Sequence, residues 1–526
     1  MHLADWVVLA IYIATMVAIG AWANRRQTDT EAYFVGNRNI KWWAAGLSII
    51  ATSFSAASIL GVPGFAYADD MWYLQYQLGD IFAALIVIVL FIPFFHRVRG
   101  LTTAYEYLEA RFDLKTRLLG SSLFILTVLL RAGTLLFGAA LLFSAVSPTD
   151  LLPGLTSVEE AVVIFGLVAI IYTVMGGISA VIWTDVIQFS IMSIGILASI
   201  AIVVLSTPGG VATAFAEGSQ FGKLDIIHLD EPIARTGLLT AVFGYGLLAL
   251  SLFGTNQQPV QRYMTVKNPR EAQRALLLGV SAGVIGVTLS LLLGVFLFIF
   301  YQHFPNLLPA ELTPDQVMPH FVNTQVPPVL TGALVAAVFA AAMSSLDSAL
   351  NSMAAAVTVD FVKRFKPDVS DAGRLTFAKF VVVAAGVIGI GVGIYSSRTE
   401  APLIDLILTF MGYFAGGLLG LFLLGMLTRR ANGDGAFVGA IVGTLVVLMM
   451  TENDLPLPQM YAWLGREPVP FIWSTGLGLL ITMGVGYLVS MLGSPVPPER
   501  LEGTTLRRPA GSSARAVTGS ETGRGA

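Results

Sequence analysis

The chain has 526 residues, of which 55% are hydrophobic and only 12% are charged. A soluble globular domain carries roughly 25% charged residues, so most of this chain is expected to lie in a lipid bilayer. The net charge of −3 argues against a nucleic-acid partner, and the lack of cysteine excludes disulfides and thiolate metal sites.

Apolar segments recur along nearly the whole chain. A transmembrane helix needs about 20 apolar residues, because the hydrocarbon core is about 30 Å thick and a helix rises about 1.5 Å per residue. The first segment has no basic leader and no A-x-A-like cleavage site, so we expect it to be retained. Thirteen spans are predicted, at approximately residues 4–23, 41–66, 73–95, 117–147, 155–175, 179–206, 235–258, 272–303, 328–360, 374–397, 401–427, 434–452 and 470–493.

Basic residues support this odd number of spans, because Lys and Arg accumulate in cytoplasmic loops. With the N-terminus outside, most of the 30 basic residues, Arg262 among them, fall on the cytoplasmic side. A missed or extra helix would reverse the alternation downstream. We therefore predict a multi-pass protein of the plasma (inner) membrane with its N-terminus outside and its C-terminus in the cytoplasm.

Soluble catalytic modules are not expected. Residues 499–526 are rich in Gly, Ser, Thr, Arg and Pro, which predicts a disordered cytoplasmic tail too short for a catalytic domain. The sequence contains no P-loop and no H-E-x-x-H motif, and its five histidines are not clustered. These observations argue against an enzyme and against a nucleotide-driven pump.

Among the charged residues inside predicted spans four stand out, namely Asp80, Arg131, Asp185 and Asp347. Such residues cost roughly 2.5 to 3.5 kcal/mol each on insertion scales and are functional candidates, although internal ion pairs are the alternative. Arg131 follows Arg117 by about 14 residues, or roughly 21 Å of helix rise, which places it near the bilayer centre. It could bind a carboxylate through two parallel hydrogen bonds. A permanent pair between Arg131 and Asp80 is the alternative.

The second predicted span is unusually rich in small and polar residues. Residues 45–64 combine Ser, Thr, Gly and Pro in one apolar segment, so this helix is expected to break. Discontinuous membrane helices expose backbone carbonyls, which bind sodium, and half-helix N-termini, which attract anions. Close helix packing is the alternative explanation for the small residues.

A polar stripe follows one face of the span that begins near Pro328. Its members lie at i, i+3, i+4, i+7 and i+8, and they are Ser344, Asp347, Ser348, Asn351 and Ser352. Hydroxyl and carboxylate oxygens are hard ligands, which suit a hard cation such as sodium. Interhelical hydrogen bonding is the alternative.

Four motifs resemble the sodium/solute symporter family, and the resemblance extends over residues 4 to 492. They are YTVMGGISAVIWTDVIQ (172–188), GTNQQPVQRY (254–263), MSSLDSALNS (343–352) and GMLTRRANGDGAFVG (425–439). The resemblance implies an all-α membrane protein with thirteen transmembrane helices and a LeuT-type 5+5 inverted repeat. Residues 1–40 would then form an extra N-terminal helix and loop, 41–427 the ten-helix transport core, 428–498 two extra C-terminal helices, and 499–526 the tail.

By the same resemblance, sodium is bound by three backbone carbonyls and two hydroxyls. These belong to Ala51, Phe54, Ala341, Ser344 and Ser345. Some family members hold a second cation, at positions that match Asp185, Ser344, Asp347 and Ser348 here. Asp347 replaces a hydroxyl, so it could strengthen a second sodium site or bind a proton and leave one sodium per cycle.

The substrate is expected to be a small polar organic solute rather than a sugar. Sugar-carrying members have an Asn and a Tyr-Trp pair at the positions where this chain has Ala249, Leu252 and Phe253. The region of Arg131 resembles instead the sialic-acid-carrying members. The expected substrate-binding residues are Ser53, Ser55, Ser58, Gln77 and Arg131.

The leading hypothesis is sodium-coupled import of a carboxylate-bearing solute by alternating access, with the sodium ion, the solute and the lipid bilayer as partners. Proton-coupled transport of a neutral solute such as a sugar, through Asp185 and Asp347, and a membrane sensor domain are the alternatives. The sequence leaves the oligomeric state open.

Overall fold

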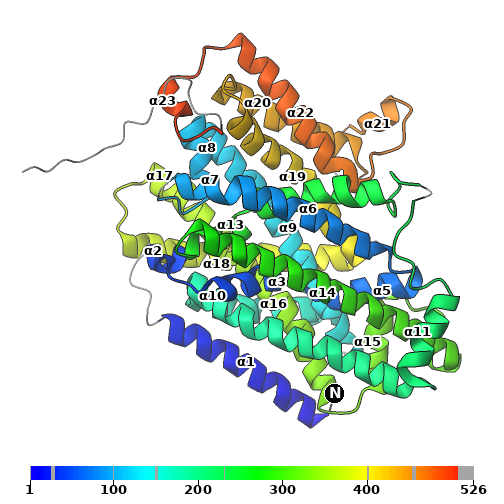
Figure 1. The fold of residues 1–526 in the computed structure, drawn as a ribbon. Coiled ribbons are helices and arrows are strands. Elements are labelled where there is room, and N and C mark those ends of the chain that lie inside the picture. Colours follow the sequence, from blue (N-terminus) through cyan, green and yellow to red (C-terminus); the bar gives the residue numbers. More distant parts are fainter. Residues whose placement is uncertain are drawn as a thin grey trace, which may run out of the picture.

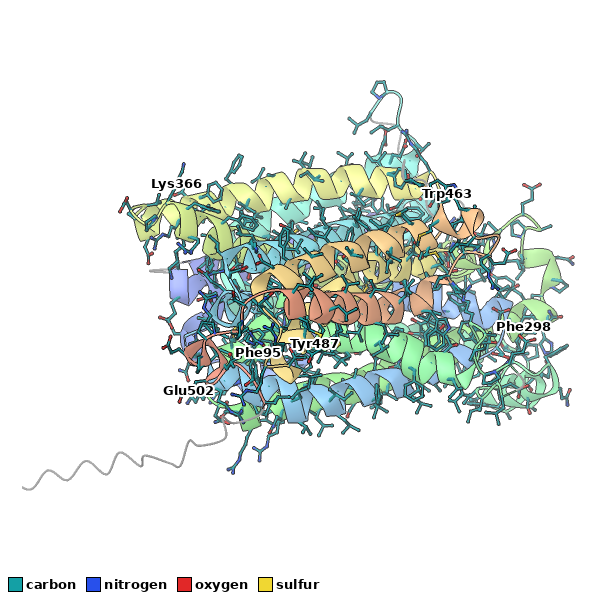
Figure 2. The ribbon with its side chains drawn as sticks, turned by 90° about the horizontal axis from the view of Figure 1, so that it is seen from above. Phe95, Phe298, Lys366, Trp463, Tyr487 and Glu502 are labelled. Carbon is teal, nitrogen blue, oxygen red and sulfur yellow. The ribbon has the colours of Figure 1, made fainter. Side chains whose placement is uncertain are left out.

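The computed structural model describes residues 2–24, 30–98, 100–147, 152–229, 231–399, 402–452 and 458–506. In this part of the chain helix follows helix, and the only β-type pairing is an isolated bridge between His228 and Gly237. The all-α class is therefore confirmed. The long helices run between two ends of the molecule, with Lys366 and Glu502 at one end and Trp463 and Phe298 at the other (Figure 2).

Helices lie at each position where the sequence predicts a span (Figure 1). Their bounds are α1 Leu3–Asn24, α3 Trp42–Ser53 with α4 Ala56–Ile59 and α5 Gly61–Ala68, α6 Tyr76–Ile86 with η3 Val87–Phe91 and α7 Ile92–Arg97, α9 Leu114–Val146, α10 Ser157–Ser206, η4 Thr240–Tyr245 with α12 Gly246–Thr255, α14 Pro269–His303, α16 Leu330–Ala356 with η6 Val357–Val362 and α17 Lys363–Phe365, α18 Asp371–Ser397, α19 Leu403–Leu427, α20 Gly433–Met450 and α22 Phe471–Leu492. Shorter helices connect them, namely α2 Thr30–Val35, η1 Gly36–Arg38, η2 Trp72–Gln75, α8 Glu106–Arg111, α11 Gly210–Gln220, α13 Gln257–Thr265, η5 Pro305–Leu307, α15 Pro314–Gln325, α21 Met460–Trp463 and α23 Pro498–Leu501.

Ten helices among the described residues are long and apolar enough to cross a membrane, or eleven if a pair bent by 74°, Trp42–Ser53 and Ala56–Ala68, forms one span. The helix Thr240–Thr255 is apolar but shorter. The count of thirteen spans therefore stays a prediction.

Helix α10 covers two of the predicted spans and is kinked between them. Gly177 at the kink has φ 62° and ψ 174°, a backbone conformation that is essentially restricted to glycine. This change of direction falls between residues 175 and 179, where the sequence predicts one span to end and the next to begin.

Close helix packing surrounds the broken helix and the C-terminal helices. A Cβ atom on Gly46 of α3 would lie 2.7 Å from the carbonyl oxygen of Ala275 on α14, so these two backbones meet directly. Helices α20 and α22 pack on each other and on α19 in the same way, and Gly439 faces the Thr482 carbonyl. In Figure 1 these two helices form one flank of the molecule and α1 lies on the opposite flank. The broken helix, in contrast, contacts α10, α14 and α16.

The structure differs from the prediction for the first part of the tail. Leu501 of α23 is buried, and the Leu506 N–H donates to the carbonyl of Met426 over 3.0 Å. The Tyr107 hydroxyl of α8 also donates to the carbonyl of Thr504. The segment up to Leu506 therefore packs on α8 and on the end of α19 because its few apolar groups and free backbone groups find partners there. Residues 507–526 of the predicted disordered tail lie outside the described residues.

Candidate functional site

The predicted break in the second span lies between α3 and α4. Phe54 and Ser55 have extended backbone conformations, with φ −82° and ψ 97° for Phe54. The side chain of Ser55 accepts from the backbone N–H of Ser58, and the Ser58 hydroxyl accepts from the backbone N–H of Ser55 over 3.3 Å. This capping box begins α4, and the carbonyls at the end of α3 are left free to bind side chains.

Side chains of α16 bind these free carbonyls. The single proton of the Ser344 hydroxyl is shared between the carbonyl of Ala51, at 2.8 Å, and that of Ala341, at 3.1 Å. The Ser345 hydroxyl donates over 3.0 Å to the carbonyl of Thr52, a residue that the sequence analysis did not include. Hydroxyl oxygens that donate one bond keep lone pairs for a cation.

The structure thus brings four of the five expected sodium ligands to the break, and Phe54 lies in the break itself. Both hydroxyls are almost completely buried. The described residues contain no group of three or more His, Cys, Asp or Glu side chains placed to hold a metal ion. The neutral oxygens at the break are the candidate cation site.

Arg131 of α9 reaches the same broken turn. Its guanidinium donates to the Thr52 carbonyl over 3.1 Å and to the Gln258 side-chain oxygen over 3.3 Å. Its Nε has no partner among the described residues, although the side chain is only 6% exposed. Asp80 is bonded to Tyr245 instead, and the described residues contain no ion pair between Asp80 and Arg131. The alternative of a permanent pair is therefore wrong for this structure.

The residues expected to form a second cation site have other partners here. The Arg262 guanidinium forms an ion pair with Asp185 over 3.0 Å and donates to the Ser348 hydroxyl over 2.5 Å. It also donates to Ser48, whose hydroxyl in turn donates to Asp185. Asp347 accepts a hydrogen bond of 2.6 Å from Thr173 on α10. A guanidinium, rather than an open space, lies beside Asp185.

Arg262 is the functional candidate that the sequence analysis missed. Its position between two predicted spans placed it in a cytoplasmic loop, whereas the structure shows it 1% exposed in α13. The sequence did contain one indication of a role for Arg262, namely its place in the motif GTNQQPVQRY. In the structure the polar residues of this motif are almost all buried.

Two cavities, each of about 100 Å³, flank the break. The first is lined by α3, α4, η2, α6, the η4–α12 segment and α14, and it includes Ser53, Ser58, Gln77 and Asp80. The second reaches α9 and α19, and it includes Ser53, Ser55, Ser58 and Arg131. An ordered water needs roughly 10 to 15 Å³ of such volume, so both cavities have room for part of an organic solute. All five expected substrate-binding residues therefore line these cavities.

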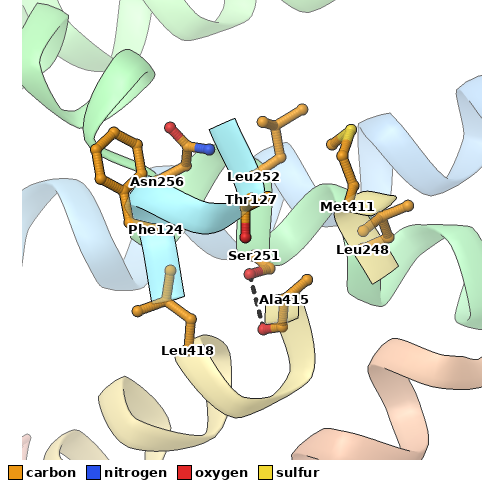
Figure 3. Close-up of a pocket in the computed structure, with 9 residues that line it drawn as sticks. All are labelled: Phe124, Thr127, Leu248, Ser251, Leu252, Asn256, Met411, Ala415 and Leu418. Atoms are coloured by element: carbon orange, nitrogen blue, oxygen red, sulfur yellow. Dashed lines mark hydrogen bonds between the residues drawn. The ribbon is translucent and has the colours of Figure 1, made fainter. Parts of the chain in front are cut away.

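The space below Arg131, toward the end that holds Arg117, is nearly filled. A remnant of about 10 Å³ lies between α9, α12 and α19, with Phe124, Met411 and Leu418 among its walls (Figure 3). The Ser251 hydroxyl donates to the Ala415 carbonyl over 3.0 Å and joins α12 to α19 there (Figure 3).

Ion pairs tie the helices together beyond this constriction. Arg117 binds the fully buried Asp360 of η6 over 2.7 Å and Glu109 of α8 over 2.8 Å. Burial alone would raise the pKa of Glu109, but hydrogen bonds and charges from Arg117 and Arg364 outweigh burial and lower that pKa. Glu109 is therefore ionised at neutral pH. At the opposite end, Arg235 pairs with Asp405 over 2.7 Å.

Comparisons with known proteins agree with this arrangement. The model of the "Sodium:solute symporter family" matches residues 33–443. The chain belongs to the sodium:solute symporter family.

The relatives of this symporter are sodium-coupled transporters. It is 30% identical to the sodium/sialic acid symporter NanT of Aliivibrio fischeri, over 92% of each chain. It is 32% identical to the sodium/sialic acid symporter SiaT of Proteus mirabilis, over 84% of this chain and 88% of that one. The symporter is thus a sodium-coupled transporter and not an enzyme, as the sequence predicts.

Solved structures show the same fold. A substrate-bound, outward-open Na+-coupled sialic acid symporter superposes with a TM-score of 0.81 at 30% identity, covering 94% of this chain and 99% of that one. MhsT in complex with L-phenylalanine superposes with a TM-score of 0.51 at 16% identity, covering 86% and 98%, which shows a shared fold alone.

Proposed function

We propose that this symporter imports a small, polar, carboxylate-bearing organic solute together with sodium, by alternating access around the break between α3 and α4. The observation that carries the proposal is Arg131, a buried cation beside a cavity with an unpartnered Nε and no carboxylate partner among the described residues. A buried guanidinium with free donors is suited to two parallel hydrogen bonds with a carboxylate. Ser53, Ser55, Ser58 and Gln77 would hold the rest of the solute.

Sodium would bind at the carbonyls of Ala51, Phe54 and Ala341 with the hydroxyls of Ser344 and Ser345. These hard, neutral oxygens suit a monovalent hard cation. We propose one sodium per cycle, because the Arg262 cation already neutralises Asp185, the anionic member of the second candidate site. Asp347, bonded to Thr173, would then hold α16 against α10.

The proposal includes the membrane arrangement expected from the sequence. The chain would cross the plasma membrane thirteen times, with a 5+5 inverted repeat in residues 41–427, helices outside the repeat in 1–40 and 428–498, and the N-terminus outside. The end that holds Lys366 and Glu502 in Figure 2 would then be cytoplasmic. Its excess of Lys and Arg supports that orientation.

Uptake into liposomes tests the function. Purified protein in sealed vesicles is offered sialic acid, short alkanoates, neutral amino acids and sugars, with an inward sodium gradient, with equal sodium, or with a proton gradient alone. We expect a carboxylate-bearing solute to accumulate only with the sodium gradient. Uptake that follows the proton gradient at constant sodium, or uptake of neutral sugars alone, would overturn the proposal.

A further inference from the structure

Asp80 is a second buried charge that the proposed carboxylate site does not use. It lies on α6 and lines the first cavity together with Gln77 and two tyrosines, Tyr73 and Tyr245. The Tyr245 side chain is hydrogen-bonded to its carboxylate, but the described residues offer it no cationic partner. A carboxylate in a membrane-spanning helix without a counter-charge marks a ligand or ion pathway.

Asp80 and Arg131 stand at similar depths in the molecule. Arg131 follows Arg117 by 14 residues and Asp80 precedes Arg97 by 17 residues, which is roughly 21 Å and 25 Å of helix rise. Arg97 follows Phe95 by two residues, and Phe95 lies toward the end that holds Glu502 and Lys366 (Figure 2). Arg117 stands near the same end, because it shares Glu109 with Arg364, two residues before Lys366. The two charges therefore lie at mid-depth in the molecule, Asp80 on α6 and Arg131 on α9.

The cavities beside these two charges meet. Both are lined by Ser53, Ser58, Tyr73, Tyr245 and Leu252, so they share the residues of the break and one aromatic wall. One cavity has Asp80 in its wall and the other has Arg131. A single solute that fills both would meet an anion at one end and a cation at the other.

Two tyrosine rings, Tyr73 and Tyr245, line the cavity wall together with Asp80. Aromatic ring faces attract cations, and a carboxylate supplies the counter-charge and acceptor oxygens. Tyr245 stacks on Tyr76 with ring centroids 4.9 Å apart, and Tyr73 lies 5.1 Å from Tyr76, so the aromatic wall is held by ring contacts. Such packing fixes the rings before a solute arrives.

We propose that the solute of this symporter is a zwitterion of the amino-acid type, with its carboxylate on Arg131 and its ammonium group on Asp80. This inference rests on the proposed function, because it keeps the carboxylate at Arg131 and adds a requirement at the other end. A zwitterion neutralises both buried charges at once, whereas a simple carboxylate leaves Asp80 without a counter-charge.

A matched ligand series tests the inference without any mutation. The purified full-length protein is titrated in sodium buffer with ω-amino carboxylates of two to six carbons, and apparent Kd values are obtained from thermal shifts. Each is compared with the ω-hydroxy carboxylate and with the alkanoate that has a methyl group in place of the ammonium, such as 4-aminobutanoate, 4-hydroxybutanoate and pentanoate. We expect at least one amino compound to bind about tenfold more tightly than both of its analogues.

Variants assign the effect to Asp80. Asp80→Asn should abolish the difference in affinity between each amino compound and its alkanoate, while Asp80→Glu should retain part of that difference. Asp368→Asn is the matched control, because Asp368 is exposed in the loop after α17. Equal binding of amino compounds and alkanoates by the unmodified protein, or an ammonium preference that survives in Asp80→Asn, would overturn the inference.

The same data separate this inference from the proposed function. Alkanoate binding that requires Arg131 but gains nothing from an ammonium group would leave the proposed function intact and reject the zwitterion. Failure of every carboxylate to bind would reject both.

Discussion

Arg131 and Ser345 donate hydrogen bonds to the same carbonyl oxygen, that of Thr52 at the end of α3. One peptide unit of the broken helix therefore contacts both a proposed substrate ligand and a proposed sodium ligand. A sodium ion that binds the Ser345 hydroxyl changes the hydrogen bond from Ser345 to the Thr52 carbonyl. The strength of the bond from Arg131 to the same carbonyl then changes as well. Coupling of this kind is reciprocal, so the solute should raise sodium affinity by the factor by which sodium raises solute affinity.

Replacing each hydroxyl in turn tests this coupling. Ser344→Ala and Ser345→Ala should each weaken sodium activation of uptake by about tenfold, because loss of one ligand or hydrogen bond costs roughly 1 to 2 kcal/mol. Only Ser345→Ala should also reduce the enhancement of solute affinity by sodium. The measurement is the solute concentration for half-maximal uptake at several sodium concentrations.

Ser352→Ala is the control for these variants. The Ser352 hydroxyl lies on the same helix and is equally buried, but it donates to the carbonyls of Ser348 and Ala349 within α16. We expect it to leave sodium activation unchanged. Normal sodium activation in both Ser344→Ala and Ser345→Ala would remove the proposed sodium site.

A second prediction concerns the geometry of the guanidinium. Arg131→Lys should lower solute affinity by about a hundredfold, because an ammonium group keeps the charge but cannot form two parallel hydrogen bonds with a carboxylate. Sodium should still stabilise the solute-free variant in a thermal-shift assay. Thr127→Val, one turn earlier on α9, removes a hydroxyl that donates to the Leu123 carbonyl of its own helix and should bind solute normally. Retained solute affinity in Arg131→Lys would exclude the bidentate contact.

Sequence patterns predicted the helices and the break well, because these depend on local composition. Long apolar runs form helices wherever they occur in lipid, and the Ser- and Gly-rich stretch around Ser53 cannot sustain one unbroken helix. The partner of Arg262 could not be predicted in the same way, since Asp185 lies 77 residues earlier and only tertiary packing brings the two together. Charge counting also treats every arginine between two spans as solvated, whereas this one is buried.

A third prediction follows from that buried pair. Arg262→Gln should destabilise the fold by about 3 to 5 kcal/mol, because it leaves Asp185 as an uncompensated buried charge. Adding Asp185→Asn should recover part of the loss, since the pair is then removed together. Denaturation midpoints of the single and double variants in detergent measure this difference.

Sodium dependence of the same variants tests the stoichiometry. With one sodium per cycle, uptake should depend on sodium with a Hill coefficient near one. The double variant, if it folds, should keep that value. A coefficient near two that falls to one on Asp185→Asn would instead show that Asp185 binds a second sodium ion.

The fourth prediction concerns the ion pairs at the end of the molecule that holds Arg117. The chain has no native cysteine, so Ser251→Cys introduces a single thiol at the constriction below the cavities. In vesicles that expose this end, a membrane-impermeant maleimide should modify that thiol slowly. Adding Arg117→Met should raise the labelling rate by about tenfold or more, because the closed arrangement loses its buried ion pair with Asp360. Removing one partner of a buried pair costs roughly 3 to 5 kcal/mol.

Arg364→Met provides the matched comparison for this labelling. Arg364 also binds Glu109, over 3.0 Å, but it is half exposed, and exposed pairs contribute only about 0 to 1 kcal/mol. Its removal should leave the labelling rate nearly unchanged. Equal rates in the Arg117→Met and Arg364→Met backgrounds would mean that the buried pair with Asp360 does not hold this end closed. Closure would then depend on the apolar side chains at the constriction, chiefly Phe124 and Leu418, which hinder access without any contribution from charge.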